Sequence, residues 1–220
     1  VSNNFYKNTI NEFKQLELKD ISFSYNNRKK ILDKSSLKIN RGQFIGFHGE
    51  SGSGKTTLLN IILGLIEPQQ GQIFYNNSLS NKYTVMQNSS YISQTNFIID
   101  DTLRNNITLE VNHDKTNDLD VMHAIQLAKL SEYFDTLPYG LDTFLGEDGM
   151  SVSGGQRQRI AFARTFYHNR DFIIMDEATN SLDKNTEHEI LNELKDLNGN
   201  KTILLVSHDI DTLKYCDIIY

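Results

Sequence analysis

One stretch decides the fold: Gly49-Glu50-Ser51-Gly52-Ser53-Gly54-Lys55-Thr56. It matches the pattern G-x-x-x-x-G-K-[ST], in which glycines let the backbone wrap closely around an anion with its N–H groups pointing inward. An apolar strand is expected before it, at 44–47, and a helix after it, over about 54–65 and ending before Pro68. This order of strand, glycine-rich loop and helix predicts an α/β fold that binds phosphate.

The side chains of this loop indicate which phosphate compound it holds. Lys55 can reach the outer phosphates of a nucleotide, Thr56 can ligate Mg²⁺, and the helix N-terminus adds a positive dipole. A nucleoside triphosphate with Mg²⁺ is therefore the predicted ligand, and we take it to be ATP. The residues predicted to contact it here are Gly49, Glu50, Ser51, Gly52, Ser53, Gly54, Lys55, Thr56 and Thr57.

A second motif lies far along the chain, where the apolar run 172–175 ends in Asp176 and Glu177. The end of such a strand lies at the carboxyl edge of a parallel sheet, where ligands of open α/β folds bind. Alone this pattern is weak, since many buried strands end in Asp. Beside a phosphate loop it predicts that Asp176 holds Mg²⁺ and that Glu177 is the general base, or orients the water, for attack on the γ-phosphate.

Hydrophobic patterning divides the rest of the chain into three parts. Short alternating runs between 16 and 47 predict an antiparallel β region. The middle, about 100–166, is predicted mostly helical, with a long loop over 138–153 and a helix over 155–166. One amphipathic helix there is predicted from Leu119, Met122, Ile125, Leu127, Ala128 and Leu130. The last third alternates apolar runs at 172–175 and 203–206 with a helix over about 184–197, which predicts a parallel sheet.

Composition excludes several classes of protein. The formal net charge of −6 argues against a non-specific nucleic-acid binder, which needs clustered Lys and Arg. The longest apolar run, 61–66, is far shorter than the ~20 residues that cross a bilayer. The single cysteine, Cys216, leaves no internal disulfide and suits a reducing compartment such as the cytoplasm. Because the chain begins at Val1 and has no apolar leader, we expect it to be a domain of a longer protein.

The stretch Val152-Ser153-Gly154-Gly155-Gln156-Arg157-Gln158-Arg159 narrows the fold to a family. It resembles the signature of ATP-binding cassette (ABC) proteins, usually Leu-Ser-Gly-Gly-Gln, with Val in place of Leu. Small residues at a helix N-terminus form a second anion site, and a second site suggests presentation to a partner. The resemblance covers 16–220 and implies a phosphate-loop (RecA-like) core with a parallel sheet, an N-terminal antiparallel β subdomain and a helical signature subdomain at about 100–166.

The family resemblance also implies roles for residues that would be unremarkable alone. Tyr25 resembles the aromatic that stacks on adenine, and Gln94 the glutamine that touches both ATP and Mg²⁺. His208 resembles the switch histidine that contacts the γ-phosphate and completes the catalytic pair with Glu177. Two copies are expected to pair head to tail, with Ser181 and Asp183 at the interface. In such a dimer, Ser153, Gly154, Gly155 and Gln156 would act on the ATP of the partner.

Two further stretches resemble transporters of the exporter type. These are 101–107, after the glutamine, and 137–149, in which Glu147 would contact the membrane helices. Residues 1–15 would then be a linker from a membrane domain fused upstream, which places the chain on the cytoplasmic face of the inner or plasma membrane. The expected function is therefore the ATP-hydrolysing motor of an exporter. The chain stops at Tyr220, where the family usually continues with a strand and a helical tail.

Three alternatives stay open from the sequence. An ATPase subunit of an ABC solute importer is the nearest, and it would lack the exporter-like stretches. A soluble ABC ATPase of DNA repair or chromosome organisation would carry a long coiled-coil or zinc insertion, and one linked to translation would usually have two such domains in one chain. A plain phosphate-loop kinase would lack the signature.

Overall fold

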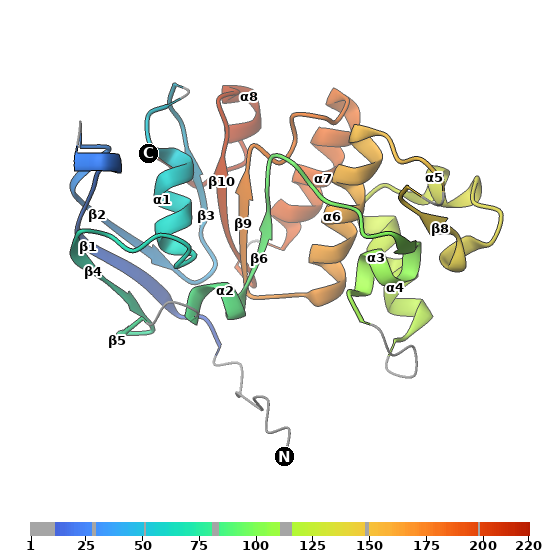
Figure 1. Ribbon diagram of the computed structural model, residues 1–220, viewed down its shortest axis with the longest axis horizontal. Helices are drawn as coiled ribbons and strands as arrows, with labels where there is room; N and C mark the ends of the chain where they lie inside the picture. Colours follow the sequence, from blue (N-terminus) through green and yellow to red (C-terminus); the bar gives the residue numbers. More distant parts are fainter. Residues whose placement is uncertain are drawn as a thin grey trace, which may run out of the picture.

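The computed structural model describes residues 12–27, 30–50, 52–80, 84–110, 116–147, 150–197 and 199–220. It has three parts that lie side by side (Figure 1): an antiparallel sheet, a central parallel sheet with flanking helices, and a helical part. The predicted linker, 1–15, falls mostly outside the described residues, as do Ser51 and the pair Asp148 and Gly149.

The antiparallel sheet has the strand order β2-β1-β4-β5. Its strands are β1 (Gln15–Phe23), β2 (Leu32–Asn40), β4 (Gln70–Tyr75) and β5 (Ser78–Leu79). The short apolar runs expected near 16–18 and 21–25 form one strand, β1, because a bulge between Leu18 and Ile21 shifts the register without ending the pairing. Asp20, with φ of 51°, makes that bulge. The extra residue leaves both Leu18 and Ile21 facing the core.

The central sheet is parallel and has the strand order β11-β3-β10-β9-β6. Its strands are β3 (Phe44–Phe47), β6 (Ser89–Ile92), β9 (Phe172–Asp176), β10 (Thr202–Val206) and β11 (Ile218–Ile219). Side chains of β9 alternate between two buried clusters, with Ile173 and Met175 in one and Phe172 and Ile174 in the other. Burial on both faces explains why β9 and β10 are continuous apolar runs.

Helices complete the core around this sheet. The helix α1 (Lys55–Ile62) follows β3, α7 (Lys184–Asp196) joins β9 to β10, and α8 (Ile210–Leu213) precedes β11. The short helix α2 (Thr84–Asn88) leads into β6. The helix after the phosphate loop is shorter than the expected 54–65, since residues 63–66 form a turn. A short strand, β11, follows His208 before the chain stops, whereas the sequence was expected to end before the strand that usually follows in the family.

The helical part contains α3 (Leu103–Thr108), α4 (Asp118–Leu127), α5 (Ser131–Asp135) and α6 (Gly154–His168). Two expectations about it were wrong. The stretch 138–153 is not all loop, since it holds a 3-10 turn, η3 (Gly140–Asp142), and the strand β8 (Phe144–Leu145), which pairs with β7 (Asp101–Thr102). Leu119 is 77% exposed because it lies at the start of α4, off the buried stripe of Val121, Ala124 and Ile125.

The expected fold class is confirmed: a parallel-sheet α/β core, an antiparallel β part and a helical part. Over the residues that the structure describes, no helix combines the length and the hydropathy that a membrane span requires.

Candidate active site

The phosphate loop connects β3 to α1 at the carboxyl edge of the central sheet, and its described residues include Gly49, Glu50 and 52–54. The Lys55 ammonium donates hydrogen bonds to the carbonyl oxygens of Gly49 (2.6 Å) and Glu50 (2.8 Å). Gly54 has φ of 100°, and a Cβ there would lie 2.6 Å from the Ile31 side chain. Both the backbone conformation and the close approach therefore require glycine at this position.

Tyr25 and Thr57 lie at one side of the loop. Tyr25 belongs to the turn η1 (Tyr25–Asn27), is 47% exposed, and its hydroxyl lies 3.5 Å from Thr57 Oγ1. Its ring packs edge-on against Phe23 at 4.9 Å between centroids. The structure thus brings an exposed aromatic face beside α1, where the sequence predicted contact with adenine.

Asp176 ends β9, and its register partner on β10 is Val206, which in turn pairs with Phe47 before the phosphate loop. It is buried, and burial raises the pKa of its carboxyl group, as does the neighbouring charge of Glu177. A hydrogen bond from Thr56 and the charge of Lys55 offset only part of that rise. The ionised carboxylate therefore lacks sufficient positive charge around it.

Tyr91, on β6, is a neighbour of Asp176 that the sequence motifs did not indicate. Burial raises the pKa of Tyr91 to about 12, and a hydrogen bond to Asp176 and the negative charge of that carboxylate contribute. The residue directly precedes the Ile92-Ser93-Gln94 segment, and that proximity was the only signal for it in the sequence.

Glu177 is the residue on which the predicted catalytic groups converge. Gln94 Nε2 donates to its Oε2 (3.1 Å), and His208 Nδ1 lies 3.6 Å from its Oε1. Asn180 Nδ2, which the sequence analysis missed, also donates to Oε2 (3.0 Å). The backbone of Glu177 has φ of 50°, a conformation that costs energy for a residue other than glycine, and its N–H is bonded to Val206 O (3.0 Å).

These residues suit a single Mg²⁺ ion bound together with a nucleotide. In the described part of the chain, no three acidic, histidine or cysteine side chains gather as a metal site of their own. Mg²⁺ is usually held by one or two carboxylates, water and substrate phosphates rather than by a full protein cage. Buried Asp176, with a carboxylate short of positive charge and the Thr56 hydroxyl bonded to it, fits that kind of site.

The predicted signature begins α6. Ser153 is the N-cap, and its hydroxyl accepts from Gln156 N (3.3 Å) while Gln156 Oε1 accepts from Ser153 N (2.8 Å), which forms a capping box. Ser153 and Gly154 are exposed. The signature thus presents a helix N-terminus at the surface.

The signature packs on the loop that carries Ser181. A Cβ on Gly155 would lie 3.1 Å from the Ser181 carbonyl oxygen, so a side chain at this position would be tightly packed against that loop. Buried Gln158 accepts a hydrogen bond from Ser181 N (3.0 Å) and donates one to Ala178 O. Ser181 and Asp183 themselves are exposed, and Asp183 caps α7 by accepting from Thr186 N (3.0 Å). The predicted interface residues therefore share one surface with the signature.

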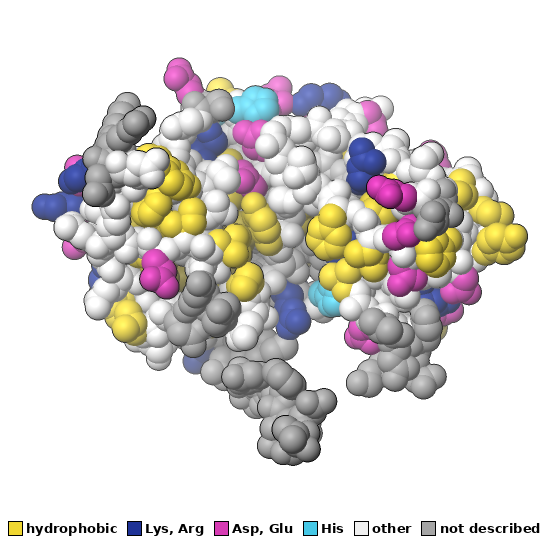
Figure 2. All heavy atoms as spheres, in the orientation of Figure 1, with side chains coloured by type: hydrophobic (Ala, Val, Ile, Leu, Met, Phe, Trp, Pro, Cys, Tyr) yellow, Lys and Arg dark blue, Asp and Glu magenta, His cyan; other side chains and the backbone are white. Residues whose placement is uncertain are grey.

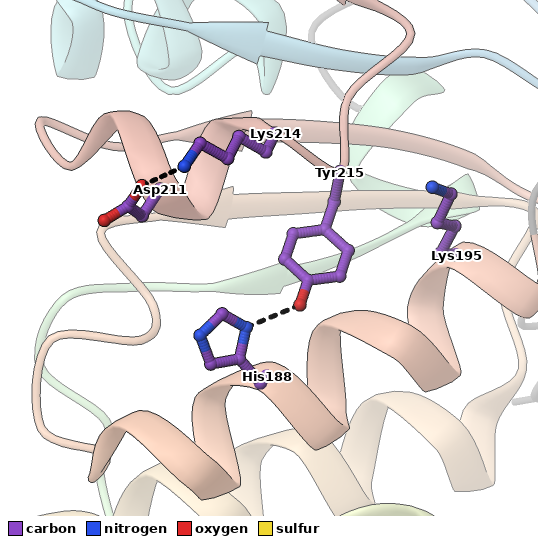
Figure 3. Close-up of a pocket in the computed structure, with 5 residues that line it drawn as sticks. All are labelled: His188, Lys195, Asp211, Lys214 and Tyr215. Atoms are coloured by element: carbon purple, nitrogen blue, oxygen red, sulfur yellow. Dashed lines mark hydrogen bonds and ion pairs between the residues drawn. The ribbon is translucent and has the colours of Figure 1, made fainter.

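A separate hollow of about 370 Å³ lies between α7 and the segment after α8 (Figure 3). A hydrogen bond joins His188 Nδ1 to the Tyr215 hydroxyl (2.6 Å), and Lys214 pairs with Asp211. Lys195 completes the lining. None of the predicted ATP-binding residues contributes to this hollow, so it is distinct from the site at the sheet edge.

Comparisons with known proteins identify the family of this chain. A sequence model described as "ABC transporter" matches residues 32–180, more than half of the chain. A "Probable ABC transporter ATP-binding/permease protein" of Haemophilus influenzae is 34% identical over 211 residues, which is 94% of this chain and 38% of that protein. An "ATP-dependent lipid A-core flippase" of the same species is 34% identical over 208 residues, which is 93% of this chain and 35% of the flippase.

A solved structure shares the fold. It is that of a bacterial Atm1-family ABC exporter with ATP bound, and it superposes with a TM-score of 0.85 at 26% sequence identity. The match covers 99% of this chain and 38% of the exporter chain. The chain therefore spans well under half the length of the proteins it resembles.

Proposed function

Because the chain belongs to the ABC transporter family and is one of its ATP-hydrolysing domains, we propose that it drives an exporter as a head-to-tail dimer. The observation that carries the catalytic part of the proposal is the convergence of Gln94 and His208 on Glu177 beside the phosphate loop. The transport part draws support from the relatives, one of which is named as an ATP-binding/permease protein and another as a flippase.

Hydrolysis would begin with a water molecule held by Glu177. A carboxylate fixed by Gln94 and Asn180 can accept a proton from that water as it attacks the γ-phosphate. Lys55 would bind the outer phosphates, and His208 would contact the γ-phosphate beside Glu177. Thr56 and Asp176 would hold Mg²⁺, with Gln94 beside them. Bound Mg²⁺ neutralises charge on the β- and γ-phosphate oxygens.

Pairing with a second copy would supply the remaining donors. The exposed N-terminus of α6 offers backbone N–H groups and a positive dipole to an anion outside its own chain. Ser153, Gly154, Gly155 and Gln156 would cap the γ-phosphate held by the partner, with Ser181 and Asp183 between the two chains. The capping box leaves this turn preorganised, which lowers the cost of binding.

A second surface suits contact with the membrane domain. A hollow of about 380 Å³ lies between β6 and α6 and includes Phe97, three residues after Gln94. Phe97 is 60% exposed, and the Arg164 guanidinium lies over its ring at 4.5 Å. Figure 2 shows apolar side chains gathered in two groups on this face, one on each side of a paler central band. A helix end docked there would contact the segment that follows Gln94, which includes Asn96 and Phe97.

The exporter-like stretches and the fused relatives favour an exporter over an importer subunit. Glu147 is exposed, as contact with membrane helices requires. In this arrangement residues 1–15 would link the domain to a membrane part upstream, and the domain would work at the cytoplasmic face of the membrane. The match to ATP-binding/permease proteins over 38% of their length supports that linkage.

Light scattering with ATP and Mg²⁺ on the Glu177→Gln and Ser153→Arg variants tests the dimer. Glu177→Gln should bind ATP, turn it over at least about 10²-fold more slowly, and accumulate as a dimer. Adding Ser153→Arg to that variant should return it to monomer while nucleotide affinity of the single chain changes little. A Glu177→Gln variant that hydrolyses ATP normally, or a dimer indifferent to Ser153→Arg, would refute the arrangement.

A further inference from the structure

Glu187, in the first turn of α7, is a buried carboxylate outside the sequence motifs. Its side chain is 7% exposed. It accepts hydrogen bonds from Thr212 Oγ1 (2.8 Å) and Lys184 Nζ (2.9 Å), and a third from Thr179. Burying a charge is costly unless it is paired and hydrogen-bonded, so a carboxylate with three donors is held in one place.

The carboxylate of Glu187 stays ionised despite its burial. Burial alone would raise its pKa, but the hydrogen bonds from Thr179, Lys184 and Thr212 outweigh that effect and lower it. A charged acceptor makes shorter and stronger hydrogen bonds than a neutral one. The three donors are therefore tied to Glu187 more firmly than by ordinary side-chain contacts.

Two of these donors, Thr179 and Thr212, lie shortly after the two catalytic residues, and the third, Lys184, is the first residue of α7. Buried Thr179 lies two residues after Glu177, and buried Thr212 lies four residues after His208. Lys184 also pairs with Asp209, the neighbour of His208, at 2.6 Å. We call Thr179, Lys184, Glu187, Asp209 and Thr212 the Glu187 cluster. It bridges the loop of Glu177 to the loop of His208 through the start of α7.

We propose that Glu187 is a positioning residue for ATP hydrolysis. It holds together the segments that carry Glu177 and His208, and so sets the separation of these two side chains. The 3.6 Å between Glu177 Oε1 and His208 Nδ1 depends on how the segments that follow β9 and β10 are placed, and the Glu187 cluster joins these segments beyond the paired strands. The inference rests on the proposed function, since it assigns a role in that reaction. It also links the catalytic pair to Asp183, the N-cap of α7 at the proposed dimer surface.

The same helix offers a matched control. Glu193 also lies on α7 and pairs with Lys129 at 2.7 Å, but its side chain is 30% exposed, and among the described residues it makes no bond to the segments that follow β9 and β10. If the ion pairs of α7 act only by holding the helix in place, the Glu193→Gln and Glu187→Gln variants should behave alike. If Glu187 positions the catalytic pair, only its variant should alter turnover.

Steady-state ATPase measurements on the chain decide between these outcomes. Glu187→Gln should lower kcat about 5–20-fold, an effect in the range of an imperfectly placed catalytic group, while KM for ATP changes less than about twofold. Glu193→Gln should match the parent in both constants. Lys184→Met, at a side chain that is 66% exposed, should lower kcat in the same direction as Glu187→Gln.

A double-mutant cycle distinguishes positioning of the catalytic pair from a general effect on the stability of the domain. In a His208→Ala background, Glu187→Gln should lose most of its effect on kcat, because the pair it positions is already broken. Equal kcat in the Glu187→Gln and parent proteins, or a fall that persists undiminished with His208→Ala, would overturn the inference. A parent chain that binds ATP but does not hydrolyse it would instead refute the proposed function.

Discussion

Asp176 and Glu187 are buried to the same extent, at 5% and 6% exposed, yet their surroundings differ in kind. Burial and the adjacent Glu177 raise the pKa of Asp176, and the donors near it do not compensate. Burial acts on Glu187 in the same direction, but Thr179, Lys184 and Thr212 reverse it and lower the pKa. The groups around Asp176 do not offset its burial, whereas those around Glu187 do.

This difference in surroundings distinguishes a carboxylate that binds a ligand from a carboxylate that has a structural role. A buried charge without enough partners lowers stability, and it persists where a ligand supplies the missing counter-charge. A buried charge with a full set of donors holds its neighbours in place. The end of β9 therefore has the electrostatics of a cation site, whereas the start of α7 has those of a scaffold behind it.

The largest expected effect is the loss of ATP turnover when Asp176 loses its charge. Asp176→Asn should lower ATP turnover by at least about 10²-fold, because the group proposed to hold Mg²⁺ loses its charge. Without nucleotide, the same variant should raise the thermal midpoint, since the poorly compensated charge is gone, by about 2–4 °C for each kcal/mol gained. Calorimetry and an ATPase assay measure both.

Glu177→Gln provides the control for this prediction, because it should lose turnover without removing the buried charge of Asp176. A thermal midpoint that falls in Asp176→Asn would contradict the comparison. It would mean that the carboxylate is already well paired in the free domain.

The next effect concerns stability at Glu187. Glu187→Ala leaves Thr179 and Thr212 without their acceptor and should cost about 1–3 kcal/mol of unfolding free energy, measured by urea titration. Glu193→Ala removes a more exposed pair and should cost less than about 1 kcal/mol. Equal losses at the two positions would show that the Glu187 cluster is no firmer than a surface ion pair.

The contrast between these carboxylates also marks what the sequence could predict. Gly54, Lys55 and Asp176 belong to contiguous patterns whose spacing follows from wrapping a phosphate at a strand end, so the motifs, the helix after the loop and the parallel sheet were predictable. Glu187 was not, because Thr212, one of its partners, lies 25 residues away and the two meet only after α7 and β10 pack. No local pattern records that contact.

The errors in the predicted fold have the same origin. Leu119 fits an apolar helical stripe, yet α4 meets the rest of the helical part through Val121 and Ile125 instead. The bulge at Asp20 joins two apparent strands into β1, and it is set by pairing with β2 rather than by local propensity. Local sequence patterns predict where an element forms, but they do not predict which of its residues pack against a distant element.

The smallest effect is a difference in pH dependence. The pKa of Glu187 is lowered from its ordinary 4.5, so its stabilisation is complete at neutral pH and disappears as pH falls through the lower value in the folded chain. The pKa of Asp176 is raised from 3.8, so its ionisation lowers stability as pH rises above that value. Unfolding free energies measured from pH 7 down to about pH 3 should therefore show the two variants approaching the parent from opposite sides. On acidification, Asp176→Asn should lose its higher stability relative to the parent, and Glu187→Gln should lose its lower stability. If both variants approached the parent from the same side, the distinction between a ligand-binding and a structural carboxylate would be wrong.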